Sequence, residues 1–181
     1  MMNLPNFLTI GRILLIPFFI LFSNQASAGA SIAAASVFLF ASLTDLLDGY
    51  LARRRSEVTQ FGKFLDPVAD KLLILSALIL LVGNGRIPAW IAIVLVGREF
   101  AVTGFRAIAS SEGVIIAAEG TGKYKMFFQI LAIIFLIIDF PEASFHFVGL
   151  VFLWISMFLS LYSAGRYFIK FGRVVNLQKV K

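Results

Sequence analysis

The chain has 181 residues, of which 60% are hydrophobic and 14% are charged, and its mean hydropathy is +0.92. Soluble domains are about 45–50% apolar and about 25% charged, so this composition excludes an ordinary soluble domain, a disordered chain and a nucleic-acid-binding module. The formal net charge is +6, there is no cysteine, and His146 is the single histidine, which excludes disulfides, thiolate metal sites and zinc sites with several imidazoles. We therefore expect one all-α integral membrane domain over residues 1–181.

Apolar runs predict the membrane-spanning helices, each of which needs about 20 mostly apolar residues. In chain order, the predicted spans are residues 7–22, 30–51, 65–82, 88–108, 121–138 and 145–169. The fifth span is the weakest, because its continuous apolar part begins only at Met126. The turn residues 83–86, with Gly, Asn and Gly before Arg86, separate the third and fourth spans, and the breaker Asp-Phe-Pro-Glu at 139–142 separates the fifth and sixth.

The first apolar segment has a second interpretation. Arg12, the apolar run 13–22 and the small residues 26–28 follow one another in the order of a cleavable signal peptide. A single arginine preceded by Phe7 and Leu8 makes a poor positive region, however, so we expect this segment to remain as the first helix.

Basic residues alternate between the predicted connections. They gather in the second connection, in the fourth and in the C-terminal tail, at positions Arg53, Arg54, Arg55 and Lys63, then Arg106, Lys123 and Lys125, and then Arg166, Lys170, Arg173, Lys179 and Lys181. The other connections nearly lack lysine and arginine. The positive-inside rule therefore predicts six spans with both termini in the cytoplasm, in the inner (cytoplasmic) membrane.

Four aspartates lie where the second and third predicted helices meet the cytoplasmic side. Asp45 and Asp48 are three residues apart, and Asp66 and Asp70 are four apart, so each pair shares one helical face. A short connection makes these helices antiparallel neighbours, and the two pairs can then face each other. Ionisable groups within a membrane are costly, which makes such a cluster a candidate site rather than a chance arrangement.

Divalent cations would cancel the repulsion among these carboxylates. Oxygen-only ligands favour Mg²⁺ or Mn²⁺, and two such ions could clamp a diphosphate and stabilise an in-line displacement at phosphorus. The alternative, in which each aspartate caps a helix or pairs with a nearby cation, explains one aspartate better than four. A second alternative is a divalent-cation transporter, although its site would be expected nearer the membrane midplane.

The fixed positions of this stretch are Asp45, Asp48, Gly49, Ala52, Arg53, Gly62, Asp66 and Asp70. All eight are in register with the signature of the CDP-alcohol phosphotransferase family, which the sequence resembles. The resemblance implies a six-helical fold with its site at the cytoplasmic face and a homodimeric assembly. It further implies that the four aspartates hold the metals, that Asp70 also deprotonates the acceptor hydroxyl, and that Gly49, Arg53 and Gly62 hold the cytidine nucleotide.

More of the chain resembles the phosphatidylglycerophosphate synthase branch of this family. Asn6, Thr9 and Arg12, which share a helical face, are similar to the opening of that branch and are assigned to the CDP-lipid side. Arg98, Arg106, Lys123 and Lys125 lie in segments that are similar to its later motifs, and they would bind the acceptor phosphate. Arg98 and Glu99 could instead pair structurally, and the two lysines could simply follow the positive-inside rule.

This resemblance implies the reaction. CDP-diacylglycerol, entering from the membrane lipids, would pass its phosphatidyl group to glycerol 3-phosphate, releasing CMP and phosphatidylglycerophosphate. Another acceptor, such as inositol phosphate or serine, or diacylglycerol with a CDP-alcohol donor, remains open because it would use the same chemistry.

Overall fold

The protein is described from a computed structural model, which covers residues 4–25, 27–55, 60–111, 121–138 and 143–178. Within these ranges, the side chains at 4–5, 45–55, 60–64, 66, 121–122, 143 and 173–178 lie outside the description.

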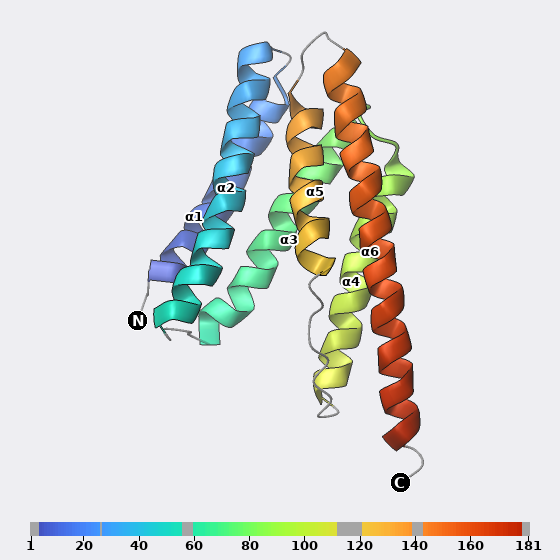
Figure 1. The fold of residues 1–181 in the computed structure, drawn as a ribbon. Helices are drawn as coiled ribbons and strands as arrows, with labels where there is room; N and C mark the ends of the chain where they lie inside the picture. The colour runs from blue at the N-terminus through green and yellow to red at the C-terminus, as the bar shows by residue number, and fades with distance from the viewer. Residues whose placement is uncertain (1–3, 26, 56–59, 112–120, 139–142, 179–181) are drawn as a thin grey trace.

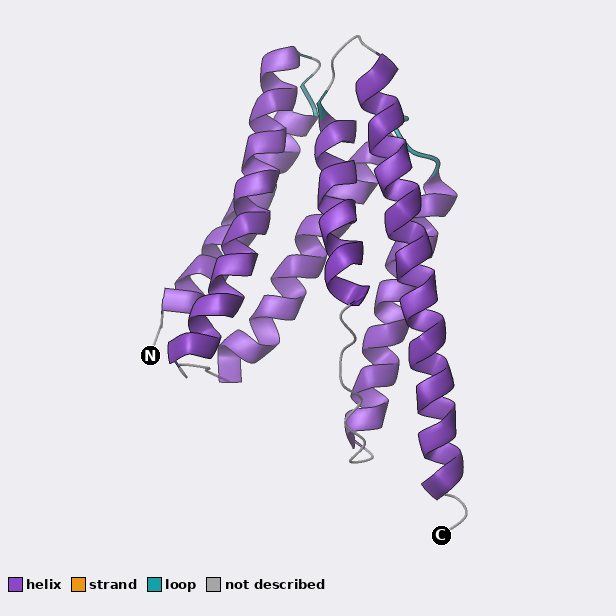
Figure 2. Cartoon of the chain, in the orientation of Figure 1, coloured by secondary structure: helices purple, strands orange, loops and turns teal. Residues whose placement is uncertain are grey.

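The described chain is helical and contains no strand in those ranges (Figure 2). Its six helices are α1 (Leu4–Ser23), α2 (Ala28–Arg55), α3 (Gln60–Gly83), α4 (Ala89–Ser111), α5 (Thr121–Ile137) and α6 (Ala143–Gln178). A helix occurs at each of the six predicted positions, which confirms the all-helical fold class. The main difference is α6, which continues well beyond the predicted end at residue 169.

Two helices in the described part have an apolar stretch long enough to cross a bilayer, at Asn6–Ser23 in α1 and Ser144–Gly172 in α6. A shorter apolar stretch, Ala28–Thr44, lies in α2. At 36 residues, α6 is about 54 Å long, well over the hydrocarbon thickness of about 30 Å. Its C-terminal part therefore extends beyond the apolar layer that its N-terminal part would cross.

The helices run up and down in turn. The start of α1, the end of α2, the start of α3 and the ends of α4 and α6 lie toward the lower end of the bundle in Figure 1. α1 packs against both α2 and α3, whereas α5 packs against α6, which also contacts α4. Two helices join these groups: α2 contacts α5, and α3 contacts both α4 and α5.

Small residues allow these helices to approach closely. Ala34 and Ala41 on α2, Ala77 on α3 and Ala132 on α5 are fully buried. A Cβ added at Gly149 of α6 would lie 2.7 Å from the Cγ atom of Leu136 on α5, so this glycine permits the α5–α6 contact. Close packing of small residues is how helices associate in lipid, where burying apolar surface gives little driving force.

Large apolar side chains point outward from the bundle. Ile93, Phe147 and Phe158 are 65% or more exposed, and many other large apolar residues are also exposed. A soluble monomer rarely exposes so many large apolar side chains, whereas a helical bundle surrounded by lipid does. The surface therefore agrees with the membrane character that the composition predicts.

Candidate active site

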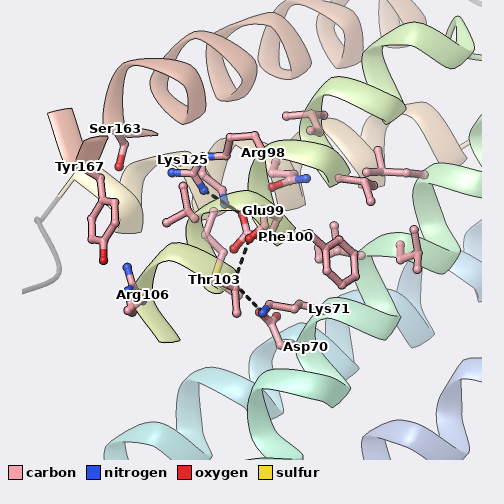
Figure 3. Close-up of a pocket in the computed structure, with 18 of the residues that line it drawn as sticks. Asp70, Lys71, Arg98, Glu99, Phe100, Thr103, Arg106, Lys125, Ser163 and Tyr167 are labelled. Atoms are coloured by element: carbon pink, nitrogen blue, oxygen red, sulfur yellow. Dashed lines mark hydrogen bonds and ion pairs between the residues drawn. The ribbon is translucent and has the colours of Figure 1, made fainter. Parts of the chain in front are cut away.

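A cavity of about 490 Å³ lies between α3, α4, α5 and α6. Its apolar wall includes Leu78, Leu95 and Met126. Its ionic wall comprises Asp70, Lys71, Arg98, Glu99, Arg106, Lys123, Lys125 and Lys170 (most of them labelled in Figure 3). Among the described residues that line the cavity, six have cationic side chains and two have carboxylates. The cavity therefore combines apolar surface with an excess of positive charge, and it suits an anion that carries an apolar part.

The cavity brings together five residues that the sequence nominated from three separate segments. Asp70 comes from the third predicted helix, Arg98 and Arg106 from the fourth, and Lys123 and Lys125 from the fifth. All five line the same space. Their convergence fits the predicted acceptor site, and their roles in binding remain predictions.

Glu99 holds two of these cations in place. Its Oε2 atom accepts a hydrogen bond from Nη1 of Arg98 at 2.8 Å and forms an ion pair with the ammonium group of Lys125 (Figure 3). Arg98 also donates from Nε to the backbone carbonyl of Ser160 on α6, at 2.9 Å. The structural pairing of Arg98 with Glu99, one of the two interpretations of the sequence, is therefore present, and it links α4 to α5 and α6.

A second polar contact joins α3 to α4. The ammonium group of Lys71 donates to the Oγ1 atom of Thr103 at 2.8 Å, and that hydroxyl donates to the backbone carbonyl of Glu99 at 2.8 Å. Lys71 follows Asp70 directly, and Asp70 is half-buried at the edge of the cavity. This contact fixes the part of α3 that carries Asp70 against the wall of the cavity.

Arg106 and Lys123 differ from the pair held by Glu99. Both side chains are exposed, and neither forms an ion pair or a hydrogen bond with any residue in the described ranges. The guanidinium carbon of Arg106 lies 5.8 Å from the ring centre of Tyr167. These two cations are therefore the ones whose charge is most available to a bound anion.

The predicted polar face of α1 lies inside the bundle, away from this cavity. Asn6, Thr9 and Arg12 are 5%, 0% and 1% exposed. The Nε atom of Arg12 donates to the backbone carbonyl of Ala41 on α2 at 3.2 Å. The three residues, whose spacing predicts a shared helical face, are therefore all buried, and a role in binding the CDP-lipid remains a prediction.

The signature itself is described only in part. The side chains of Asp45, Asp48, Gly49, Arg53, Gly62 and Asp66 lie outside the described residues, although their backbone belongs to α2 and α3. Of the four aspartates, the structure therefore describes only the Asp70 side chain. Within the described ranges, no group of three or more histidines or acidic residues could hold a metal ion. The metal site stays a prediction based on the carboxylate oxygens, which are suitable donors for a hard cation.

The cavity also contains residues that the sequence analysis did not select. Ser163, Tyr167 and Lys170 line it from α6, and Lys71 and Thr103 line it from α3 and α4. The three α6 residues are four and three positions apart, so they form a polar stripe on one face of an otherwise apolar helix. That stripe was a detectable signal, because polar residues at helical spacing in such a helix require a polar surrounding.

Residues 2–162 match the model of the CDP-alcohol phosphatidyltransferase family. The chain belongs to this family. The match spans every residue that the sequence nominated for the site, whereas Ser163, Tyr167 and Lys170 lie just beyond it. Membership agrees with the register of the signature and identifies the helical bundle as that of a CDP-alcohol phosphatidyltransferase.

Several curated relatives resemble the chain over most of its length. A Bacillus subtilis protein is 43% identical over 185 residues, covering 94% of this chain and 95% of the relative. A Pseudomonas fluorescens protein is 41% identical over 174 residues (92% and 88%), and a Rickettsia bellii protein is 37% identical over 169 residues (92% and 93%). All three are named CDP-diacylglycerol–glycerol-3-phosphate 3-phosphatidyltransferase.

Proposed function

We propose that this protein transfers the phosphatidyl group of CDP-diacylglycerol to glycerol 3-phosphate, giving phosphatidylglycerophosphate and CMP. The observation that carries the proposal is the cationic cavity beside Asp70, in a CDP-alcohol phosphatidyltransferase whose relatives are named for this reaction. The apolar wall formed by residues such as Leu78 and Leu95 suits the acyl chains of the donor, and the ionic wall suits the phosphate of the acceptor.

Asp70 is the proposed base. Its carboxylate would accept the proton of the acceptor hydroxyl, whose oxygen then attacks the β-phosphorus of the CDP-lipid in line with the bond to CMP. A phosphorus–oxygen bond to the acceptor forms while the bond to CMP breaks, and CMP departs as an anion. The half-buried position of Asp70 at the edge of the cavity supports this role, because an acceptor held by the cations would lie next to it.

The four signature aspartates Asp45, Asp48, Asp66 and Asp70 would together hold two Mg²⁺ or Mn²⁺ ions. Their carboxylate oxygens are the donors that such ions prefer, and the bound ions would neutralise the diphosphate. Gly49, Arg53 and Gly62, together with Asn6, Thr9 and Arg12, would bind the nucleotide side of the donor. The family membership of the chain supports these assignments.

The cations of the cavity would contribute to binding of the acceptor phosphate in two different ways. Arg98 and Lys125 are held by Glu99 and would supply a fixed positive field. Arg106 and Lys123, which have no carboxylate partner in the described ranges, would contact the phosphate directly through charge-assisted hydrogen bonds. A phosphorylated acceptor is thereby favoured over a neutral one such as serine.

We further propose six spans, with both termini and the cavity on the cytoplasmic side of the inner membrane, and a homodimeric assembly. The alternation of basic residues supports the orientation. The up-and-down order of the helices also supports it, because the start of α1 and the end of α6 lie at one end of the bundle (Figure 1).

The test is CMP release by the purified protein in mixed micelles of detergent and CDP-diacylglycerol. Glycerol 3-phosphate, inositol phosphate and serine are supplied separately, each with Mg²⁺ and with Mn²⁺. We expect CMP release with glycerol 3-phosphate and formation of phosphatidylglycerophosphate. Faster release with inositol phosphate or serine would assign a different acceptor, and Mg²⁺ flux into proteoliposomes without CMP release would assign transport instead.

A further inference from the structure

Tyr167 on α6 carries a buried hydroxyl group without a hydrogen-bond partner. The residue is only 8% exposed, it lines the cavity, and its Oη atom finds no donor or acceptor in the described part of the chain. Burying a polar group without a partner is unfavourable, and native proteins satisfy the large majority of such groups. The hydroxyl of Tyr167 is closed off from solvent at the cavity wall, and it therefore indicates a missing partner that reaches it when a neighbouring side chain, such as the exposed Arg106, moves.

The surroundings of this hydroxyl define the charge of that partner. The guanidinium group of Arg106 lies 5.8 Å from the ring centre of Tyr167, and the two side chains lie together at one side of the cavity in Figure 3. Arg106 and Lys123 also lack a carboxylate partner among the described residues. Several donors thus meet in one space with a shortage of acceptors, which is the arrangement that a multi-oxygen anion satisfies.

The position of Tyr167 along α6 also fits such a ligand. Tyr167 lies in the last part of the apolar stretch Ser144–Gly172, more than 20 residues from its start, and about 20 helical residues are enough to cross the hydrocarbon. A helix that enters the hydrocarbon near Ser144 would bring the ring of Tyr167 close to the opposite lipid headgroups, where a water-soluble phosphate can arrive and where tyrosine is common.

We infer that the Tyr167 hydroxyl donates a hydrogen bond to the phosphate group of the acceptor, next to Arg106, and so acts as an acceptor-binding residue. The inference rests on the proposed function, because that function supplies a phosphorylated acceptor. Tyr167 lies beside the Arg106 side chain on α4, whereas the signature that would hold the CDP-lipid diphosphate lies on α2 and α3. The acceptor phosphate is therefore the partner that we assign to this hydroxyl.

The test is Tyr167→Phe, which removes only the hydroxyl and keeps the ring against Arg106. A hydrogen bond to a charged group corresponds to about a 10- to 100-fold change in affinity, so the KM for glycerol 3-phosphate should rise by about that factor. The KM for CDP-diacylglycerol should stay within about twofold of wild type. The matched control is Tyr162→Phe, since Tyr162 is exposed on the same helix, stacks on Arg166 at 5.9 Å and does not line the cavity.

A merely structural role for the hydroxyl would give a different result. Because the hydroxyl makes no hydrogen bond in the described part of the protein, Tyr167→Phe should unfold at the same temperature as wild type or at a higher one. A lower unfolding temperature with an unchanged KM for glycerol 3-phosphate would overturn the inference. A selective rise in the KM for CDP-diacylglycerol would also overturn it, because the hydroxyl would then face the donor.

Failure of this inference is distinguishable from failure of the proposed function. If the proposed function is wrong, the wild-type protein will release no CMP with glycerol 3-phosphate. If only the inference is wrong, the wild type will be active and Tyr167→Phe will match both the wild type and Tyr162→Phe in its KM for glycerol 3-phosphate.

Discussion

The carboxylate of Glu99 on α4 forms an ion pair with the ammonium group of Lys125 on α5, and Arg98 shares the same carboxylate oxygen. The side chains of Arg98 and Lys125 are 9% and 12% exposed, so both cations are nearly buried. One carboxylate therefore compensates two cations and keeps them at the wall of the cavity.

Glu99→Gln should lower the stability of the protein, because it leaves two nearly buried cations uncompensated. We expect a loss of about 1–3 kcal/mol, between the values for exposed and for fully buried pairs. Thermal unfolding in detergent measures it. A double-mutant cycle with Lys125→Gln supplies the control, since coupled partners should give a double variant less destabilised than the sum of the single ones. Strict additivity would mean that the pair contributes nothing.

Asp70→Asn should abolish turnover while the fold survives. The amide keeps the size of the carboxylate but cannot take the proton of the acceptor, and loss of general-base catalysis reduces rates by about 10²- to 10⁴-fold. CMP release measures the activity, and circular dichroism with thermal unfolding checks the fold. Near-normal CMP release by a folded variant would contradict the role proposed for Asp70.

Arg106→Ala should weaken binding of glycerol 3-phosphate selectively. Loss of a charge-assisted contact predicts about a 10- to 100-fold rise in its KM, with little change for neutral acceptors. Arg166→Ala is the matched control, because Arg166 also stacks on a tyrosine, at 5.9 Å from Tyr162, but does not line the cavity. Equal effects of Arg106→Ala on charged and neutral acceptors would argue against a phosphate contact.

Chelation of divalent cations should remove the activity reversibly. The proposed cluster of four carboxylates would need bound cations to remain ionised together, so the protein treated with excess EDTA should be inactive and recover with Mg²⁺ or Mn²⁺. The readout is CMP release before chelation, after it and after dialysis against each metal. Full activity under exhaustive chelation would rule out the proposed metal site.

The absence of cysteine allows a direct test of orientation. Ser27 lies before α2 and Ser111 at the end of α4, at opposite ends of the bundle, and both side chains are exposed (Figure 1). In intact cells, Ser27→Cys should react with a membrane-impermeant maleimide, and Ser111→Cys should react only after permeabilisation. The reverse pattern would place the cavity outside the cytoplasm.

The helices were predictable from the sequence because a membrane imposes one strong rule, an apolar run of fixed length between polar breaks. The far end of α6 was not predictable in this way. Beyond residue 169 the helix continues through a segment that contains Lys170 and Arg173. Hydropathy predicts where a helix crosses the membrane, but it does not predict how far the helix extends outside it.

The sequence predicts the residues of the candidate site where a charged side chain lies in an apolar segment, because burying a charge there costs free energy. Asp70, Arg98, Arg106 and Lys125 stand out as charges among apolar residues, and the structure places all four at one cavity. Tyr167 carries no charge, so only its spacing from Ser163 and Lys170 on one face of α6 marks it in the sequence, and the missing partner of its hydroxyl is visible only in the structure.

All the described residues that line the cavity belong to helices, and no loop contributes to its described wall. Fixing the backbone of one residue costs about 1–2 kcal/mol of free energy through lost conformational entropy. The backbone of a helix is already fixed when the protein folds, so ligand binding does not add this cost. Within the described wall, a ligand that enters this cavity therefore needs to order only side chains, chiefly those of the exposed Arg106 and Lys123. The described wall of the cavity is therefore preorganised, and the proposed binding of a small anion there should be fast and require little rearrangement of these helices.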